Sequence, residues 1–457
     1  MQPDGLRESV EKMHTEGLPD IAVDTLSHYY GQLAAGESGV LPESEIEPLD
    51  EVPSYENPPE GSVREALERV VVLKLNGGLG TSMGMTKAKS LLEVKDGLTF
   101  LDIIARQVLA LRQRSGVQLP LVLMNSFYTR DESLAALDRY PELKTGVPLD
   151  FVQGKFPKLL ADSLEPASWP ANPELEWAPP GHGDLYTSIV TSGMLDTLLE
   201  HGYEYAFVSN SDNLGAVLDE RVLGWFARER LPFAMEVTDR TEADRKGGHI
   251  ARRRGGGLVL RETAQTRDED LETFQDLRRH RYFNTNNLWV NLRTLAEVMR
   301  ERGGVLGLPL IANRKTVDPS DSDSPRVIQI ETAMGAAIDA FEGAAALRVP
   351  RRRFAPVKAT NDLLGLRSDA YVLTTDVHVE LAPERGDRGA PIVHLDSTYY
   401  KLLRDFEARF AGGPPSLVGC ERLEVEGDVE FGRGVVVRGS VRLEGPRKIG
   451  DGTVLDG

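Results

Sequence analysis

Cysteine is almost absent from this chain of 457 residues, in which Cys420 is the single example. One cysteine cannot form an internal disulfide or build a metal cluster, which favours a reducing compartment. Long apolar runs are missing as well, since no stretch reaches the roughly 18 residues of a membrane-spanning helix. Residues 1–5 also lack the basic segment that opens a secretory signal. We therefore expect a cytoplasmic protein with no membrane partner.

An excess of positive charge is the third absence. The chain has 53 Lys and Arg against 71 Asp and Glu, a formal net charge of -18. This balance argues against nucleic acid as a partner. An anionic ligand must then be held by particular lysines rather than by a broad basic patch.

The length exceeds that of one ordinary core and predicts several domains. Residues 6–34 have apolar positions at helical spacing and predict two amphipathic helices, whereas residues 36–62 predict an acidic extended connector. The expected divisions are an N-terminal helical segment with its linker (1–62), a catalytic core (63–365), a connecting region (366–418) and a repeat unit (419–457).

From about residue 68 the pattern becomes β/α. Strands that alternate with helices predict a mostly parallel sheet covered on both faces, in which ligands bind beyond the C-terminal ends of the strands. The expected strands are 69–75, 119–125, 204–209 and 232–238, and the expected helices include 99–113 and 188–200. Residues 240–282 carry dense charge, and we interpret them as a solvated peripheral hairpin or loop.

The end of the chain has a six-residue period. Val425, Phe431, Val437, Leu443, Ile449 and Leu455 recur every six positions, and glycine follows four of them two places later. An apolar hexad repeat with glycine at turns is typical of a parallel β-helix, here of about two coils if three hexads close each turn. Its open end is an expected contact between copies of the chain, because an uncapped coil leaves backbone groups unpaired.

The strongest functional pattern is the glycine-rich loop that follows the strand at 69–75. The glycines at 77, 78, 80 and 84 allow the backbone to approach a ligand, while Lys87 and Lys89 add positive charge, so the loop predicts phosphate binding. It does not match a P-loop, because no lysine directly follows the last glycine. The dinucleotide fingerprint G-x-G-x-x-G is one residue shorter than the spacing from Gly78 to Gly84.

Other polar segments follow apolar strands. Asp212 comes just after the strand at 204–209, where it suits either Mg²⁺ coordination or a helix N-cap. His182 lies between two glycines, either against a ligand or in a rigid turn. The amides of Asn284–Asn287 match sugar hydroxyls but are also common in turns. Glu331 is either an acceptor for hydroxyl groups or a first-turn carboxylate that complements a helix dipole. Lys358 either stabilises developing negative charge or snorkels from an apolar strand.

Taken together, these segments resemble the eukaryotic-type UTP–glucose-1-phosphate uridylyltransferases. The resemblance runs in order over residues 70–457 through six segments: Leu75-Asn-Gly-Gly-Leu-Gly-Thr-Ser-Met-Gly84, Leu121-Val-Leu-Met-Asn-Ser126, Pro179-Pro-Gly-His-Gly-Asp184, Ser209-Asn-Ser-Asp-Asn-Leu-Gly215, Phe283-Asn-Thr-Asn-Asn-Leu-Trp289 and Pro356-Val-Lys358. It implies a nucleotide-diphospho-sugar transferase fold, which is a Rossmann-like α/β core with a mostly parallel mixed sheet, followed by a C-terminal left-handed parallel β-helix.

The resemblance also implies a reaction and its residues. UTP and α-D-glucose 1-phosphate would give UDP-glucose and pyrophosphate, reversibly and with Mg²⁺. The implied nucleotide contacts are Leu75, Asn76, Gly77, Gly78, Lys89, Gln153 and Gly181. The implied sugar phosphate contacts are Gly78, His182, Asn210, Asn284, Asn286, Asn287 and Glu331. Asp212 would bear the metal, and Lys89 and Lys358 would be catalytic.

Two departures and two alternatives remain. Lys87-Ala88 stands where the family commonly has Gly-Pro, so Lys87 is either an added phosphate contact or a surface residue. Ser211 stands where the family commonly has an apolar residue. The alternatives are a uridylyltransferase for another sugar 1-phosphate and a non-catalytic protein that binds nucleotide sugars. A nicotinamide-dependent oxidoreductase is disfavoured by the glycine spacing.

Overall fold

A mixed sheet of ten strands forms the centre of the molecule in the computed structural model, which describes residues 4–37, 39–56 and 63–457. Four neighbouring strands run parallel, in the order β10-β2-β5-β6, and the glycine-rich loop follows β2. β14 runs antiparallel beside β10, and the sheet continues through β12 and β1 on one branch and β11 and β17 on another. The bounds are β1 Ile46–Glu47, β2 Val70–Asn76, β5 Leu121–Asn125, β6 Asp150–Val152, β10 Tyr205–Asn210, β11 Phe233–Asp239, β12 His249–Arg253, β13 Leu258–Arg261, β14 Tyr282–Asn291 and β17 Ala345–Arg348.

Both faces of this sheet are covered, because successive residues of β2 point into two different apolar cores. Val70 and Val72 belong to one core and Val71 and Leu73 to the other. The first core takes side chains from α4 Phe100–Ser115, α5 Arg130–Leu137 and α8 Glu220–Arg228, and the second from α6 Leu185–Thr191, α7 Met194–Glu200 and α10 Leu292–Glu301. The prediction of an α/β core with a mixed, doubly covered sheet is confirmed, and the antiparallel pairs of that sheet lie on its β14 side.

The sequence predicted one helix over residues 188–200, but the structure has two. Gly193 has φ 73°, in the left-handed region that ends a helical run, and it separates α6 from α7. The helical pattern after Glu331 is a 3₁₀ helix over Met334–Ala340.

The interpretation of residues 240–282 as a solvated excursion is wrong. β12 and β13 do form an antiparallel hairpin, but β12 also pairs with β1 and β14 and so extends the central sheet. His249 and Arg261 at the end of this hairpin are completely buried. The charged pattern misled because Arg261 is paired internally, at 2.6 Å from Glu43 and 2.9 Å from Asp270.

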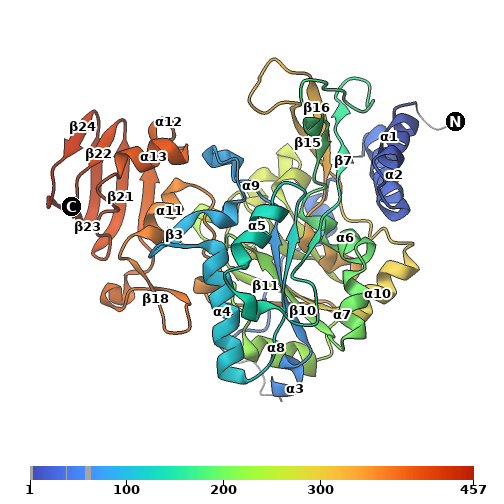
Figure 1. The fold of residues 1–457 in the computed structure, drawn as a ribbon, viewed down its shortest axis with the longest axis horizontal. Coiled ribbons are helices and arrows are strands. Elements are labelled where there is room, and N and C mark those ends of the chain that lie inside the picture. The colour runs from blue at the N-terminus through green and yellow to red at the C-terminus, as the bar shows by residue number, and fades with distance from the viewer. Residues whose placement is uncertain (1–3, 38, 57–62) are drawn as a thin grey trace.

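Two N-terminal helices lie at one end of the molecule (Figure 1). α1 Asp4–Thr15 and α2 Asp20–Ala34 confirm the predicted amphipathic pair, and their apolar faces pack against Phe156, Trp177 and Ile330. These partners belong to short strands beside the sheet, which are β7 Phe156–Pro157, β8 Leu159–Leu160, β9 Trp177–Ala178, β15 Ile311–Thr316 and β16 Arg326–Glu331. The predicted connector over 36–62 is described only outside residues 38 and 57–62, and it includes β1.

The C-terminal strands lie at the opposite end of the molecule (Figure 1). All of their pairs are parallel. From β21 onward the partners are 18 residues apart, as Leu423 is from Val441, Val429 from Arg447 and Val436 from Val454. Their bounds are β20 Ile392–Leu395, β21 Cys420–Glu426, β22 Val429–Phe431, β23 Val436–Glu444, β24 Arg447–Ile449 and β25 Val454–Asp456. A register of three hexads joins strands that are far apart in the chain, and their inward side chains continue the first core.

The remaining described α-helices and strands are short. They are α3 Val63–Leu67, β3 Glu93–Lys95, β4 Leu98–Thr99, α9 Leu271–Phe274, α11 Thr360–Arg367, β18 Tyr371–Leu373, β19 Val379–Leu381, α12 Ser397–Tyr400 and α13 Leu403–Arg409. Over the described part of the chain, no helix has both the length and the apolar character needed to span a membrane.

Candidate active site

A cavity of about 290 Å³ opens where β2, β5 and β10 end. Its walls come from segments that are distant in the chain. Most of these segments lie at or just after the ends of the parallel strands, and one is the loop before α6. The lining residues are Leu75, Asn76, Gly77, Gly78, Lys89, Ser90, Met124, Gln153, Pro179, Gly181, His182, Asn210, Ser211 and Asp212. Ten of these were predicted as site residues, so the structure gathers most of the predicted set at the expected edge of the sheet.

The first turn of the glycine loop is fixed by hydrogen bonds from neighbouring elements. Asn76 donates through Nδ2 to Asn125 Oδ1 and to Ser133 Oγ, both at 2.7 Å. Thr129 Oγ1 donates to the carbonyl of Asn76 at 2.7 Å, and Ser126 Oγ donates to that of Gly77 at 3.0 Å. The Asn76 amide nitrogen is therefore occupied within the protein, and this loop reaches the cavity in a preset geometry.

Gln153 packs closely against the first glycine of the loop. A Cβ at Gly77 would lie 2.8 Å from Gln153 Nε2, closer than such contacts are found. Gln153 itself is anchored by its backbone N–H, which donates to the carbonyl of Asn125 at 2.8 Å. The amide of Gln153 thus lies directly against the loop, where it can read the edge of a base.

Lys89 and Asp212 form the charged pair of the cavity. Lys89 Nζ lies 2.6 Å from Asp212 Oδ2, and both side chains are largely covered, with 16% and 24% of their surface exposed. The backbone N–H of Lys89 also donates to the carbonyl of Gly78 at 2.9 Å, which closes the glycine loop. The second carboxylate oxygen, Asp212 Oδ1, is buried and has no hydrogen-bond partner. An unpaired buried oxygen of this kind is costly unless a ligand completes it.

The loop of Gly181 and His182 packs against the end of β16. Gly181 has φ 77°, and a Cβ there would lie 2.5 Å from the carbonyl oxygen of Thr332. His182 Nδ1 accepts a hydrogen bond from the backbone N–H of Met334 at 3.0 Å. Burial lowers the pKa of His182 to about 4, so its imidazole is neutral at pH 7. Because Nδ1 accepts, the proton resides on Nε2, which is a donor available to the cavity.

Asp184 joins two walls of the cavity and was not among the predicted site residues. It accepts a hydrogen bond from the backbone N–H of Gly154 at 2.6 Å, and another from Ser188 Oγ. Burial raises the pKa of Asp184 to about 6. The carboxylate therefore ties the Gln153 segment to the His182 segment. The signals in the sequence were its position two residues after His182 and its place in the Pro179–Asp184 segment of the family resemblance.

Four predicted sugar contacts lie outside the lining of the cavity. Asn284 and Asn286 hydrogen-bond each other, at 2.9 and 2.8 Å, in a bulge of β14 where Asn286 has φ 57°. Asn287 is fully buried, and its Nδ2 donates to Glu236 Oε2 and to the carbonyl of Arg353. The carboxylate of Glu331 accepts a hydrogen bond from Asn313 Nδ2 at 2.9 Å. Glu331 nevertheless lies close to the cavity, because a Cβ placed on Gly181 would be 3.1 Å from the Cβ of Glu331.

Lys358 lines a neighbouring cavity of about 640 Å³, together with Ser82 and Met83 of the glycine loop. Its ammonium group lies 5.6 Å from the centre of the Phe354 ring. Burial raises the pKa of Asp362, and the positive charges of Lys358 and Lys89 oppose that rise. Both lysines are thus within electrostatic range of one carboxylate, on two sides of the glycine loop.

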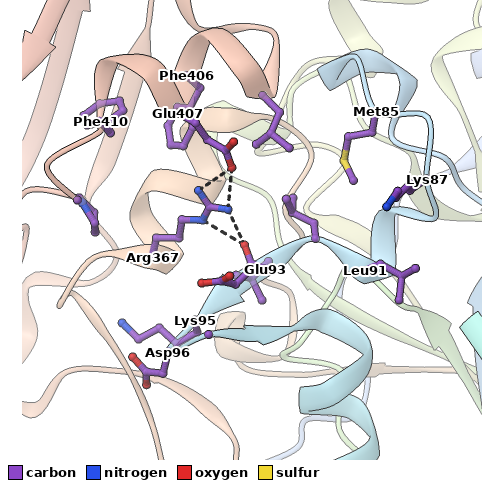
Figure 2. Close-up of a pocket in the computed structure, with 16 residues that line it drawn as sticks. Met85, Lys87, Leu91, Glu93, Lys95, Asp96, Arg367, Phe406, Glu407 and Phe410 are labelled. Atoms are coloured by element: carbon purple, nitrogen blue, oxygen red, sulfur yellow. Dashed lines mark hydrogen bonds and ion pairs between the residues drawn. The ribbon is translucent and has the colours of Figure 1, made fainter. Parts of the chain in front are cut away.

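Lys87 lines a third cavity, of about 570 Å³ (Figure 2). Met85, Leu91, Phe406 and Phe410 share it, and Arg367 crosses it to the carbonyl of Glu93. Lys87 is not among the residues that line the cavity of Lys89. This arrangement favours the surface interpretation of Lys87 over a phosphate contact.

A glycine loop after the first parallel strand, a lysine beside it and a carboxylate at the next strand end define a nucleotide-binding α/β protein of the nucleotidyltransferase class. The family model described as UTP–glucose-1-phosphate uridylyltransferase matches residues 26–438, and the chain belongs to this family.

Named relatives agree with this membership. The chain is 40% identical to the UTP–glucose-1-phosphate uridylyltransferase of Solanum tuberosum over 439 residues, which cover 93% of this chain and 89% of the relative. A variant of the UDP-glucose pyrophosphorylase of Leishmania major, solved in complex with UDP-glucose, is 46% identical, with a TM-score of 0.94 over 100% of this chain and 99% of that one. The Trypanosoma brucei structure titled UDP-glucose phosphorylase is 45% identical, with a TM-score of 0.92 over 99% and 98%.

Proposed function

We propose that this protein transfers the uridylyl group of UTP to α-D-glucose 1-phosphate, giving UDP-glucose and pyrophosphate in a reversible, Mg²⁺-dependent reaction. The observation that carries the proposal is the single cavity lined by ten of the predicted residues, with the Lys89–Asp212 pair in its wall. Family membership and the likeness to a structure that holds UDP-glucose support it.

The chemistry needs charge compensation rather than a general base. A phosphate oxygen of glucose 1-phosphate, ionised at pH 7, attacks the α-phosphorus of UTP and forms the new P–O bond. The bond from that phosphorus to the bridging oxygen of the β-phosphate breaks, and pyrophosphate leaves with the electron pair. Lys89 and Lys358, on the two sides of the glycine loop, would stabilise the charge that spreads over the phosphoryl oxygens.

The nucleotide is assigned to the wall at the end of β2. Gly77 and Gly78 would admit the phosphates close to the backbone, with Leu75 and Asn76 below them. Gln153 and Gly181 would contact uracil, since the Gln153 amide can both donate to and accept from the base edge. The packing of Gln153 against Gly77 supports a fixed distance between base and phosphate sites.

The donor set around Asp212 fits a hard divalent cation. Asp212 Oδ1 is a buried oxygen without a partner, and oxygen is the ligand that Mg²⁺ prefers. No group of three His, Cys, Asp or Glu in the described residues is arranged to hold a metal. Asp212 would therefore hold the ion together with phosphate oxygens and water, and the ion would neutralise phosphate charge.

The sugar phosphate is assigned to the wall of His182 and Asn210. His182 would donate from Nε2–H to a sugar or phosphate oxygen, and Asn210 lines the same cavity at the end of β10. Glu331 lies beside Gly181, which lines the same cavity. Asn284, Asn286 and Glu331 remain proposed sugar contacts. We leave out Asn287, because its amide nitrogen is taken up inside the protein.

The deciding experiment is pyrophosphate release measured with a panel of nucleoside triphosphates and sugar 1-phosphates, with and without Mg²⁺. We expect turnover with UTP and glucose 1-phosphate, dependent on the metal. Faster turnover with another sugar 1-phosphate would establish the first alternative instead. Absence of turnover with every pair, while UDP-glucose still binds, would establish a nucleotide-sugar-binding protein.

Three further assignments belong to the proposal. The 18-residue parallel register and the buried hexad positions support a left-handed β-helix over 419–457. Val454 on its last strand is 46% exposed, which supports a contact between copies there, testable by analytical ultracentrifugation. The single buried cysteine and the charge of -18 support a cytoplasmic location.

A further inference from the structure

Asn213 follows the proposed metal ligand directly, yet it faces away from the cavity. Its side chain is 2% exposed, and all of its strong hydrogen-bonding groups are engaged. Nδ2 donates to Asn287 Oδ1 at 3.2 Å and to the carbonyl of Arg353 at 3.1 Å. Oδ1 accepts from the backbone N–H of Ala355 at 3.0 Å. One amide thus links the loop after β10 to the segment that leads to Lys358.

The backbones of the same two segments are also paired. The N–H of Val357 donates to the carbonyl of Asp212 at 3.1 Å, and Asn213 and Pro356 form an isolated β-bridge. A Cβ on Gly215 would lie 2.3 Å from the carbonyl of Arg352, so the contact leaves no room between them. Lys358 is the next residue after Val357. Its backbone position is therefore set by the backbone of Asp212.

Lys74 holds the other side of this loop. It is 2% exposed, and its ammonium group donates to Ser209 Oγ and to the carbonyl of Ala216, both at 2.7 Å. These two partners lie before and after Asp212, so one side chain bridges the start and the end of the loop. Neither Lys74 nor Asn213 lines the nucleotide cavity.

A buried ion pair fixes the carbonyl that Asn213 contacts. Arg353 donates to Glu236 through Nε at 2.7 Å and through Nη2 at 2.6 Å, and Glu236 is completely buried. Glu236 also accepts from Asn287 Nδ2 and from Trp289 Nε1, both at 3.0 Å. A fully satisfied buried network of this kind is rigid, because each member would lose its partners on moving.

We propose that Asn213 and Lys74 are positioning residues of the uridylyl transfer, which together set the distance between the metal-bearing carboxylate of Asp212 and the ammonium group of Lys358. The proposal rests on the functions proposed above for Asp212 and Lys358. Charges that act on one transition state must be placed to within a fraction of an ångström, since a shift of about 1 Å can cost 10²-fold in rate. Binding of the base and sugar uses other walls of the cavity and does not depend on this distance.

The test compares Asn213→Ala with Asn291→Ala in the full-length protein. Asn291 caps α10 through Oδ1, which accepts from the backbone N–H groups of Arg293 and Thr294 at 3.1 Å, so its loss also lowers stability but leaves the site alone. For each variant, kcat, the KM of both substrates, and Mn²⁺ binding in the presence of UTP by electron paramagnetic resonance are measured. The Kd of UDP-glucose without metal completes the set.

We expect Asn213→Ala to lose about 10- to 100-fold in kcat and to bind Mn²⁺ more weakly. The KM of glucose 1-phosphate and the metal-free Kd of UDP-glucose should stay within about twofold, whereas the KM of UTP should rise along with the loss of Mn²⁺ affinity. Asn291→Ala should keep kcat and Mn²⁺ affinity. Should Asn213→Ala fail to fold, Lys74→Met provides the same measurement from the other side of the loop. A variant at either position that loses stability but keeps kcat and Mn²⁺ affinity overturns the proposal.

Asp212→Asn separates this proposal from the one on which it rests. Loss of Mn²⁺ binding and turnover in Asp212→Asn, with full activity in Asn213→Ala, overturns only the positioning function. Retention of Mn²⁺ affinity and turnover in Asp212→Asn overturns the proposed metal ligand itself.

Discussion

The nucleotide cavity and the C-terminal strands are organised on opposite principles. The cavity collects side chains from positions between 75 and 212 that share no repeating pattern, and each is placed by the strand or loop that precedes it. The C-terminal strands repeat one interval, because every pairing between β21 and β25 joins residues 18 positions apart, apart from one irregularity at Cys420. Most of the predicted site residues lie in the part without a repeat, and the regular packing belongs to the part with one.

This difference has an energetic side. In the cavity, polar groups are partly buried and either pair with each other, as Lys89 does with Asp212 Oδ2, or have no partner in the protein, as Asp212 Oδ1 does. In the C-terminal strands, the inward positions are apolar, and Leu423, Val425, Val429 and Val437 are completely buried. We therefore expect substitutions in the first region to change rate more than stability, and those in the second to do the reverse.

The largest effect is expected for Lys358→Ala. Removing one charge from the transition state should lower kcat on the order of 10²- to 10³-fold while the melting temperature stays close to that of the unaltered protein. Lys448→Ala in the C-terminal strands is the matched control, since Lys448 forms an exposed ion pair with Glu430 that contributes little. Initial rates of pyrophosphate release check both, and unaltered turnover in Lys358→Ala would remove Lys358 from the reaction.

The converse effect is expected for Leu423→Ala. Leu423 on β21 is completely buried, so its truncation should lower the free energy of unfolding by about 2–5 kcal/mol. At 25 °C kcat should remain within about twofold. Urea denaturation followed by circular dichroism gives the first quantity. A kcat that falls as steeply as the stability would show that the two regions are not separable in this way.

The smallest effect is expected from the titration of His182. Because its folded pKa of about 4 is below the unfolded value of 6.5, the unfolded chain takes up the proton first. His182 therefore contributes no change of stability above pH 6.5, and stability is lost as the pH falls from 6.5 towards 4. It should also add no limb to the pH profile of kcat/KM between pH 6 and 8. Nitrogen NMR of the imidazole should show a neutral ring protonated at Nε2, and a charged ring at pH 6 would contradict this.

The sequence predicts most of the cavity because its residues stand at the ends of apolar strands. Asp212 and Asn210 could be placed from the strand before them and from the rule that ligands bind at strand ends. Met124, at the end of β5, also lines the cavity and lies in a segment that carries the family resemblance, but it was not among the predicted site residues. Gln153 and Gly181 were found only through that resemblance.

The remaining differences arise from contacts that local patterns do not encode. The string Asn284–Asn287 does not reveal that a bulge in β14 turns Asn287 towards Glu236 and leaves Asn286 in a left-handed conformation. Charge in residues 240–282 suggested solvent, whereas Arg261 is buried against two carboxylates from distant segments. In both cases, the partner that decides burial lies far away in the chain.

The ion pair of Lys89 and Asp212 gives the cavity a property beyond simple attraction of phosphate. Each group is the present partner of the other, so a triphosphate that draws Lys89 away leaves the whole carboxylate of Asp212 to a cation, and a cation on Asp212 releases Lys89 to the phosphates. Nucleotide and metal should then bind with positive cooperativity, each raising the affinity of the other by the same factor. An anion that arrives without a metal must instead break the pair unaided. In a chain with a net charge of -18, such an exchange of partners would help to select a metal–nucleotide complex over the free phosphates of the cell.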